Sequence, residues 1–418
     1  MTNKLLKSYI RKEWETVFLA FLLCMYYVMP KFISVSLELL FLFYLIRTPK
    51  FRTSRVRRIP VTWYLFFSLC LFFTNIFTID SESVNYLTTC VNNFLFIVIS
   101  CLLFSSQDRI KLFLISFGFI SILLMIALVP IVMQMMIEGG ATQLGASSES
   151  SSTSFLQNPI NLGYILLLIN MCQFYGVVIT KNKIMKLYFV SLFCFSMFCI
   201  LLAGSRKAVI ACLIYLGTYF VVSNRRNKSK LFLYFVVLFV LVYVSCLIIM
   251  NVEILYWSIG RRMEGLIGYF DPKYADVDPS TESRANLINL GKQIFYENPF
   301  FGLGIKDSHK ILVATHPHNN YLTCLDFGGL LTFASYYWFH FRIYLNFYRY
   351  GAIPKMGVLL LGLMIAFALV DYTATTYNII YFPFFLTIIY LSTILPNFDI
   401  NHIKPIIYEE TKYTIYRK

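Results

Sequence analysis

The sequence predicts an all-α polytopic membrane protein, and two features carry that prediction, its composition and its apolar runs. Of its 418 residues, 58% are hydrophobic and 14% are charged, and the mean hydropathy is +0.67. Soluble domains average about 45–50% apolar and about 25% charged residues. A helix that spans a bilayer needs roughly 20 predominantly apolar residues, and such runs recur along the chain. This pattern excludes a soluble, a disordered or a coiled-coil protein.

Twelve apolar segments are expected to cross the membrane. They are 16–30, 32–46, 61–79, 86–104, 112–137, 161–180, 187–203, 208–223, 231–250, 318–340, 356–373 and 379–396. With the N-terminus inside, 26 of the 36 Lys and Arg residues fall in inside segments, which is the bias of cytoplasmic loops. Both termini are therefore predicted to be cytoplasmic. The same bias, with anionic headgroups as partners, explains the net charge of +15 without nucleic acid.

The predicted spans divide the chain into four parts. Spans one to nine fill 1–250, a large outer loop fills 251–317, spans ten to twelve fill 318–396, and a cytoplasmic tail fills 397–418. The outer loop is longer than a simple connection needs, so we expect it to contribute to function.

Prolines predict one helix inside that loop. Asp278-Pro279 suits the start of a helix, and Asn298-Pro299 suits its stop. Small or apolar residues recur between them at helical spacing and form one stripe: Leu287, Ile288, Gly291, Ile294 and Phe295. Arg284 lies three and four residues before the first two of these, so it points along the stripe. An interfacial helix would therefore place Arg284 over the outer mouth of the bundle.

Ser205, Arg206 and Lys207 lie in a turn between the seventh and eighth spans, on the predicted outer side. A cation beside the bilayer core needs headgroups or a partner. Arg binds phosphate bidentately, and the N-terminus of the following helix favours an anion. The turn is therefore a candidate phosphate site, and snorkelling to lipid phosphate is the alternative.

Three of the five histidines, His309, His316 and His318, gather at the end of the outer loop. Histidine titrates near neutrality and is the usual general base. His318 is predicted to begin the tenth span, which would hold it at the membrane surface. A metal site is a competing interpretation, although His-Pro-His lacks the i,i+4 spacing of helical zinc ligands. A structural histidine at the membrane interface is the third interpretation.

Acids within or near spans are costly when isolated, and this chain has three of them, Glu38, Asp326 and Asp371. We interpret them as structural counter-ions, with Asp371 a candidate partner for an outer Arg. Outer arginines and a surface histidine together suit a lipid-linked diphosphate substrate. Arg would stabilise the leaving group, and His would deprotonate an acceptor hydroxyl. No cofactor and no metal are expected.

Four motifs follow one another along residues 155–332. They are F-L-Q-N-P-I-N-L-G at 155–163, A-G-S-R at 203–206, E-N-P-F-F-G-L-G-I at 297–305 and H-P-H-N-N-Y-L-T-C-L-D-F-G-G-L-L-T at 316–332. Together they resemble the O-antigen ligase/polymerase family, which holds WaaL-type ligases and Wzy-type polysaccharide polymerases. Ile160 departs from the pattern, because a second Asn is common there.

This resemblance implies a metal-independent glycosyltransferase with a GT-C-like fold. It implies transfer from an undecaprenyl-diphosphate-linked oligosaccharide at the outer face of the bacterial cytoplasmic (inner) membrane. Arg206 and Arg284 would engage the diphosphate, and His318 would be the base or the acceptor-positioning group. The expected substrate-binding residues are Ser205, Lys207, His316, Asn319 and Tyr321. Besides the lipid bilayer, the expected partners are a chain-length regulator and a flippase of the same pathway.

The family's motifs do not separate its activities. A polymerase joins lipid-linked repeat units of O-antigen or capsule, a ligase passes finished glycan to the lipid A core of lipopolysaccharide, and a third group glycosylates proteins. The lack of an appended domain and a composition rich in Ile, Phe, Tyr and Asn favour the polymerase, with the ligase as the alternative. A flippase or other transporter stays open, because twelve spans also describe transporters. The outer concentration of Arg and His favours surface chemistry over a mid-membrane substrate site.

Overall fold

The computed structural model of the chain describes residues 13–26, 29–51, 56–76, 81–137, 159–203, 205–225, 227–260, 279–312, 319–349, 355–372, 376, 379 and 381–395. Every regular element in those residues is a helix, so the predicted all-α fold is confirmed.

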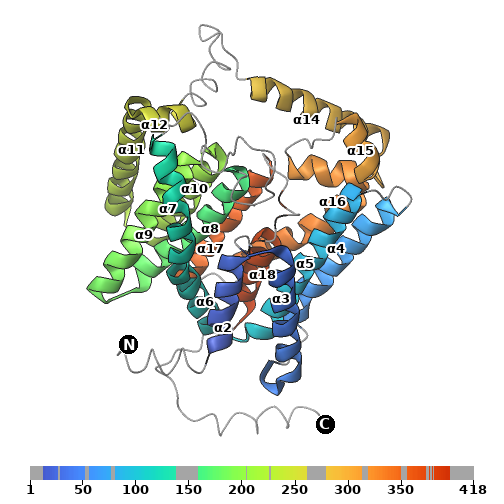
Figure 1. Cartoon of the computed structure of the whole chain (residues 1–418), viewed down its shortest axis with the longest axis horizontal. Coiled ribbons are helices and arrows are strands. Elements are labelled where there is room, and N and C mark those ends of the chain that lie inside the picture. The colour runs from blue at the N-terminus through green and yellow to red at the C-terminus, as the bar shows by residue number, and fades with distance from the viewer. Residues whose placement is uncertain are drawn as a thin grey trace.

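The helices follow one another along the chain, coloured from blue to red in Figure 1. The long ones are α2 (Trp14–Met25), α3 (Lys31–Arg47), α4 (Ile59–Asn75), α5 (Ser81–Leu103), α6 (Gln107–Ile120), α7 (Ile122–Ile137), α8 (Pro159–Ile179), α9 (Lys183–Leu202), α10 (Arg206–Asn224), α11 (Lys228–Asn251), α14 (Pro279–Glu297), α16 (Asn320–Arg349), α17 (Lys355–Asp371) and α18 (Tyr381–Ile394). The short ones are η1 (Pro49–Phe51), η2 (Val56–Arg58), α12 (Glu253–Leu255), η4 (Tyr256–Gly260) and α15 (Ile305–Ile311).

Each of the twelve predicted spans overlaps a helix. The fifth predicted span contains part of α6 and all of α7, because the helix is interrupted at Ser121. Five helical stretches in the described residues are long and apolar enough to cross a membrane: Ser83–Leu103, Gln107–Gln134, Leu162–Ile179, Lys183–Leu202 and Arg206–Asn224. A polytopic membrane protein is thus confirmed, while the number of crossings stays a prediction.

Helix α8 lies in the middle of the bundle and packs against α6, α9 and α10. It is apolar nearly all round, as expected for a helix that is buried on every side. Two polar side chains tie it to its neighbours. Asn170 donates to Ser196 of α9 at 2.7 Å, and Ser196 donates to Gln173 at 2.7 Å. Such bonds between helices satisfy polar groups that lipid cannot.

The exposed sides of α3 and α11 are apolar, as expected for helices that contact lipid. Phe32 and Leu40 of α3 are exposed by 72% and 66%, and Phe232 and Phe239 of α11 by 72% and 73%. Exposed apolar surface of this extent marks a face that contacts lipid or another chain, which agrees with the membrane assignment.

Helix α14 begins and ends where the prolines predict, and it packs on α16. The predicted stripe is its buried side, with Ile294 only 2% exposed and Gly291 buried, while Lys292 and Gln293 are exposed. Helices α14 and α15 lie along the upper edge of the view in Figure 1, at one end of the bundle.

Candidate functional site

The turn between α9 and α10 contains three predicted site residues. Ser205 is the N-cap of α10 and is only 6% exposed, whereas Arg206 and Lys207 form its first turn and are half-buried. The Ser205 side chain makes no capping hydrogen bond. First-turn amides of a helix have no partner inside the helix, so this N-terminus presents donors and a positive dipole end to an anion.

Gly163 lets α8 approach this turn closely. A Cβ atom at Gly163 would lie 2.7 Å from the Cβ atom and 2.9 Å from the Oγ atom of Ser205. Real Cβ atoms do not come so near, so any side chain here would separate the two helices. The last residue of the motif at 155–163 therefore has a packing role, and it holds the next residue, Tyr164, beside the turn.

Arg284 comes to the same place from α14. Its charge acts on the Lys207 ammonium, together with that of Arg206, and also on the Tyr164 hydroxyl. We call Arg206, Lys207 and Arg284 the cation cluster. Among the described residues, no carboxylate forms an ion pair with Lys207 or Arg284. Like charges gathered close together repel one another, so the cluster suits an anionic ligand.

A turn after α14 and a kink in α16 interlock through the backbone. Gly328 and Gly329 have non-helical dihedrals inside α16, with φ +63° at Gly329. The Asp326 carbonyl therefore accepts from Leu303 N at 2.8 Å, and Leu330 N donates to the Pro299 carbonyl at 2.8 Å. We call this contact of residues 298–304 with 326–331 the backbone lock.

Glycine is required on both sides of the lock. A Cβ atom at Gly302, where φ is +66°, would lie 2.6 Å from the Asp326 carbonyl oxygen, and one at Gly329 would overlap the Phe300 backbone. Gly302 in the motif at 297–305 and Gly329 in the motif at 316–332 are thus explained by packing. Helix α14, which carries Arg284, ends immediately before the backbone lock. The lock therefore fixes α14 against the first half of α16.

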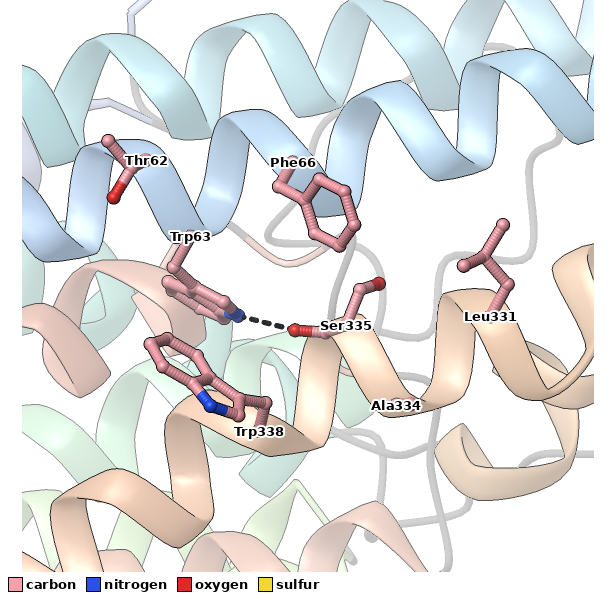
Figure 2. Close-up of a pocket in the computed structure, with 7 residues that line it drawn as sticks. All are labelled: Thr62, Trp63, Phe66, Leu331, Ala334, Ser335 and Trp338. Atoms are coloured by element: carbon pink, nitrogen blue, oxygen red, sulfur yellow. Dashed lines mark hydrogen bonds between the residues drawn. The ribbon is translucent and has the colours of Figure 1, made fainter.

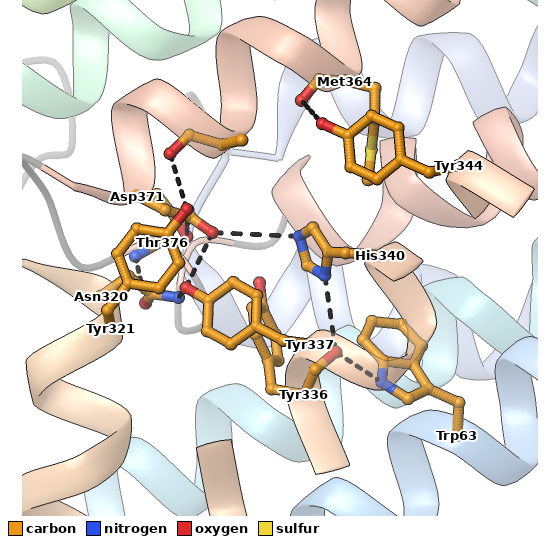
Figure 3. A network of polar contacts seen from close by, with 11 residues as sticks. Trp63, Asn320, Tyr321, Tyr336, Tyr337, His340, Tyr344, Met364, Asp371 and Thr376 are labelled. Atoms are coloured by element: carbon orange, nitrogen blue, oxygen red, sulfur yellow. Dashed lines mark hydrogen bonds and ion pairs between the residues drawn. The ribbon is translucent and has the colours of Figure 1, made fainter. Parts of the chain in front are cut away.

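A set of buried polar side chains joins α16 to α17 (Figure 3). Tyr337 donates to Asp371 Oδ2 at 2.9 Å, Thr376 donates to Asp371 Oδ1, and Asn320 donates to the Tyr337 hydroxyl at 2.8 Å. The Thr376 amide donates to Asn320 Oδ1 at 2.9 Å. We call Asn320, Tyr337, Asp371 and Thr376 the polar network. Asp371 therefore has hydroxyl partners in place of the outer Arg that its position suggested.

Two further side chains border this network. His340 Nε2 lies 3.9 Å from Asp371 Oδ2, and its Nδ1 lies 3.4 Å from the Tyr336 carbonyl. That carbonyl also accepts from Trp63 of α4 at 3.2 Å. The network therefore links α4, α16 and α17 at a buried crossing, which rigidifies the start of α16.

Asn319 and Tyr321, both predicted substrate-binding residues, take part in this scaffold. Asn319 Oδ1 accepts from Leu322 N at 3.1 Å and so caps α16. The Tyr321 hydroxyl donates to the Ala368 carbonyl at 2.9 Å, and its ring stacks on Tyr337 with centroids 4.7 Å apart. These bonds use Asn319 Oδ1 and the hydroxyl hydrogen of Tyr321, and the predicted binding roles of both residues stay predictions.

The predicted histidines divide into two groups. His316 and His318 lie outside the described residues, directly before Asn319. His309 is buried on α15, where its ring meets those of Tyr86 and Phe327 at 5.9 Å and 5.4 Å. The described residues hold no group of three potential metal-binding side chains.

Two acids have no partner for either carboxyl oxygen among the described residues. These are Glu38 on α3 and Asp326 on α16, which are 1% and 0% exposed. No partner of these two acids lies among the described residues, so their interpretation as counter-ions stays a prediction.

An apolar groove of about 420 Å³ runs between α4 and α16 (Figure 2). It is lined by Thr62, Trp63, Phe66, Leu331, Ala334, Ser335 and Trp338. The Trp63 indole donates to the Ser335 carbonyl at 3.0 Å, so its one polar hydrogen is occupied. No predicted site residue lines this groove.

Sequence patterns missed Tyr164, Tyr337 and His340. The position of Tyr164, directly after the N-P-I-N-L-G motif, is the one signal that pointed toward it. Tyr337 and His340 sit in an apolar, aromatic-rich stretch where nothing local distinguishes them from core residues.

A protein-family model matches part of the chain. Residues 189–337 match a family model described as O-antigen ligase, and no curated protein matches the chain. The matched segment includes every predicted site residue, from Ser205 to Tyr321, as well as both sides of the backbone lock. The match supports the O-antigen ligase/polymerase family that the motifs indicate.

Proposed function

We propose that this protein is a polysaccharide repeat-unit polymerase that uses a polyprenyl-diphosphate-linked glycan as donor, at the outer face of the cytoplasmic membrane. The observation that carries the proposal is the cation cluster, formed by the start of α10 and by Arg284 of α14. Its members Lys207 and Arg284 have no carboxylate partner among the described residues. A diphosphate supplies the negative charge that such a cluster needs, and Arg forks onto its oxygens.

The proposed reaction is a substitution at the anomeric carbon of the donor sugar. The acceptor hydroxyl oxygen forms the new glycosidic bond, and the bond from that carbon to the diphosphate oxygen breaks. The diphosphate leaves with the bonding electrons, and Arg206 and Arg284 stabilise its charge. His318 accepts the proton of the attacking hydroxyl.

The composition supports the polymerase, since the chain is rich in Phe and Tyr, with 41 and 30, and has only 19 Gly. The description of the matching family favours a ligase as the second candidate. A ligase would use the same donor site and differ only in its acceptor, a lipid A core in place of a lipid-linked repeat unit.

The size profile of surface and lipid-linked glycans separates the candidates. Cells without the gene are complemented with the wild-type protein or with Arg206→Ala. For a polymerase, the empty and Arg206→Ala strains carry glycan of a single repeat. For a ligase, they keep long chains on the lipid carrier and none on the core. Repeats trapped on the cytoplasmic face would instead identify a flippase and contradict the proposal.

The proposed chemistry does not route any step through a metal ion. Transfer by the purified protein in EDTA should therefore equal transfer without it. Activity that is lost in EDTA and restored by one added cation would contradict this part and favour a metal site at His316 and His318.

A further inference from the structure

Helix α8 contains two tyrosines whose hydroxyl groups are buried without a partner. Tyr164 and Tyr175 are 0% and 1% exposed, and neither hydroxyl has a hydrogen-bond partner among the described residues. Buried tyrosine hydroxyls ordinarily find one. An unpaired buried hydroxyl destabilises the fold, so each needs an explanation.

The surroundings of the two hydroxyls differ. Tyr164 directly follows Gly163, the close contact of Ser205, and the charges of Arg284 and Asp371 both act on its hydroxyl. Tyr175 lies eleven residues along α8, about 16 Å away along the helix axis, where the charge of Asp108 acts on it. Of the two hydroxyls, only that of Tyr164 is acted on by a charge of the cation cluster.

The Tyr164 ring is held in one orientation. It packs edge to face against Phe382 of α18, with centroids 5.4 Å apart and an interplanar angle of 86°. Asp371 is not its acceptor, because the Tyr164 hydroxyl has no hydrogen-bond partner among the described residues. The position of the Tyr164 hydroxyl is therefore set by packing, with its hydrogen left for a group outside this scaffold.

We propose that the Tyr164 hydroxyl donates a hydrogen bond to a phosphate oxygen of the donor's diphosphate, beside Arg284. This inference rests on the proposed function, and it names a fourth binding group for the same diphosphate. The hydroxyl is covered in this structure, so the diphosphate reaches it after the side chains above it shift. Side chains can do so by changing rotamer.

Tyr164→Phe removes the hydroxyl and keeps the ring contact with Phe382. The matched control is Tyr175→Phe, which removes the other unpaired hydroxyl of the same helix. Wild type and both variants, reconstituted in nanodiscs, are titrated with undecaprenyl diphosphate and with undecaprenyl monophosphate. Thermal unfolding without added lipid is measured for each.

We expect Tyr164→Phe to raise the Kd for undecaprenyl diphosphate about 10-fold or more, the usual effect of losing a hydrogen bond to a charged group. In a transfer assay, the KM for the donor should rise with little change in kcat. The unfolding midpoint without lipid should stay equal or rise, because an unpaired hydroxyl has been removed. Tyr175→Phe should bind undecaprenyl diphosphate as the wild type does.

Two results would overturn the inference while the proposed function stands. One is wild-type affinity in Tyr164→Phe; the other is a lower unfolding midpoint in that variant, which would show that the hydroxyl has a structural partner. A different result tests the function itself. If wild-type protein binds neither undecaprenyl lipid, the diphosphate site and this inference both fail.

Discussion

The cation cluster and the polar network differ in whether their polar groups have partners within the protein. In the polar network, Asp371, Tyr337, Thr376 and Asn320 supply one another's hydrogen bonds. In the cation cluster, Lys207 and Arg284 have no carboxylate among the described residues, and the neighbouring Tyr164 hydroxyl has no acceptor there.

This difference separates scaffold from binding site. A paired buried group stabilises the fold and offers nothing to a ligand, whereas an unpaired donor gains a partner only when a ligand arrives. Substitutions in the network should therefore lower stability, and substitutions in the cluster should lower donor binding and transfer with stability unchanged.

The largest effect is expected at the residues that do the chemistry. His318→Ala should lower transfer by about 100-fold or more, since a general base contributes that much, while the amount of protein in the membrane stays the same. His402→Ala, in the predicted cytoplasmic tail, is the control and should transfer normally. Full activity of His318→Ala would exclude His318 as the base.

The next effect tests the cluster itself. Arg206→Lys keeps the charge but loses the fork that binds two phosphate oxygens, so transfer should fall about 10-fold. Arg225→Lys makes the same change at the exposed far end of α10 and should be silent. Equal activity in the two variants would mean that Arg206 anchors lipid headgroups.

A smaller effect on transfer is expected from the polar network. Asp371→Ala leaves the Tyr337 and Thr376 hydroxyls without their acceptor, at a cost of about 1–3 kcal/mol for each unsatisfied group. The unfolding midpoint should fall, while the donor Kd of the folded protein changes little. Asp307→Ala is the control, because Asp307 makes only an exposed ion pair with Lys310. A stable Asp371→Ala protein that has lost donor binding would abolish the distinction between the two regions.

The smallest effect is expected from the backbone lock. Gly329→Ala forces a side chain to φ +63° against the Phe300 backbone, which should cost about 1–3 kcal/mol of stability. Gly217→Ala adds the same methyl group where no atom lies within 4 Å, and there the helix should gain about 0.5–1 kcal/mol. Equal unfolding midpoints for the two variants would argue that the lock does not hold α14 to α16.

Much of the fold could be predicted because its signals are local. Hydropathy marked the segments that become helices, and two prolines marked the start and the end of α14. The apolar stripe of that helix also predicted its buried side, since helical spacing alone places those residues on one face.

The candidate site could be predicted only in part. Residue type and position pointed to Ser205, Arg206, Lys207 and Arg284, because cations beside an apolar core are costly wherever they occur. The sequence did not predict which polar side chains are hydrogen-bond partners. Asp371 was expected to meet an arginine but meets two hydroxyl groups, and Tyr164 looked like any aromatic core residue. Hydrogen-bond partners come from helices far apart in sequence, so no local pattern records them.

The sequence by itself thus determined the membrane class, the helices and the chemical groups available to a site, since apolar run length, helical spacing and residue charge are properties of short segments. Only the tertiary structure decided that the charge of Arg284 acts on Lys207, that the turn at 298–304 bonds to the kinked helix α16, and which hydroxyl groups are satisfied. The physical reason is that burial and pairing depend on which distant segments pack together, and packing is set by the shapes of all the helices at once.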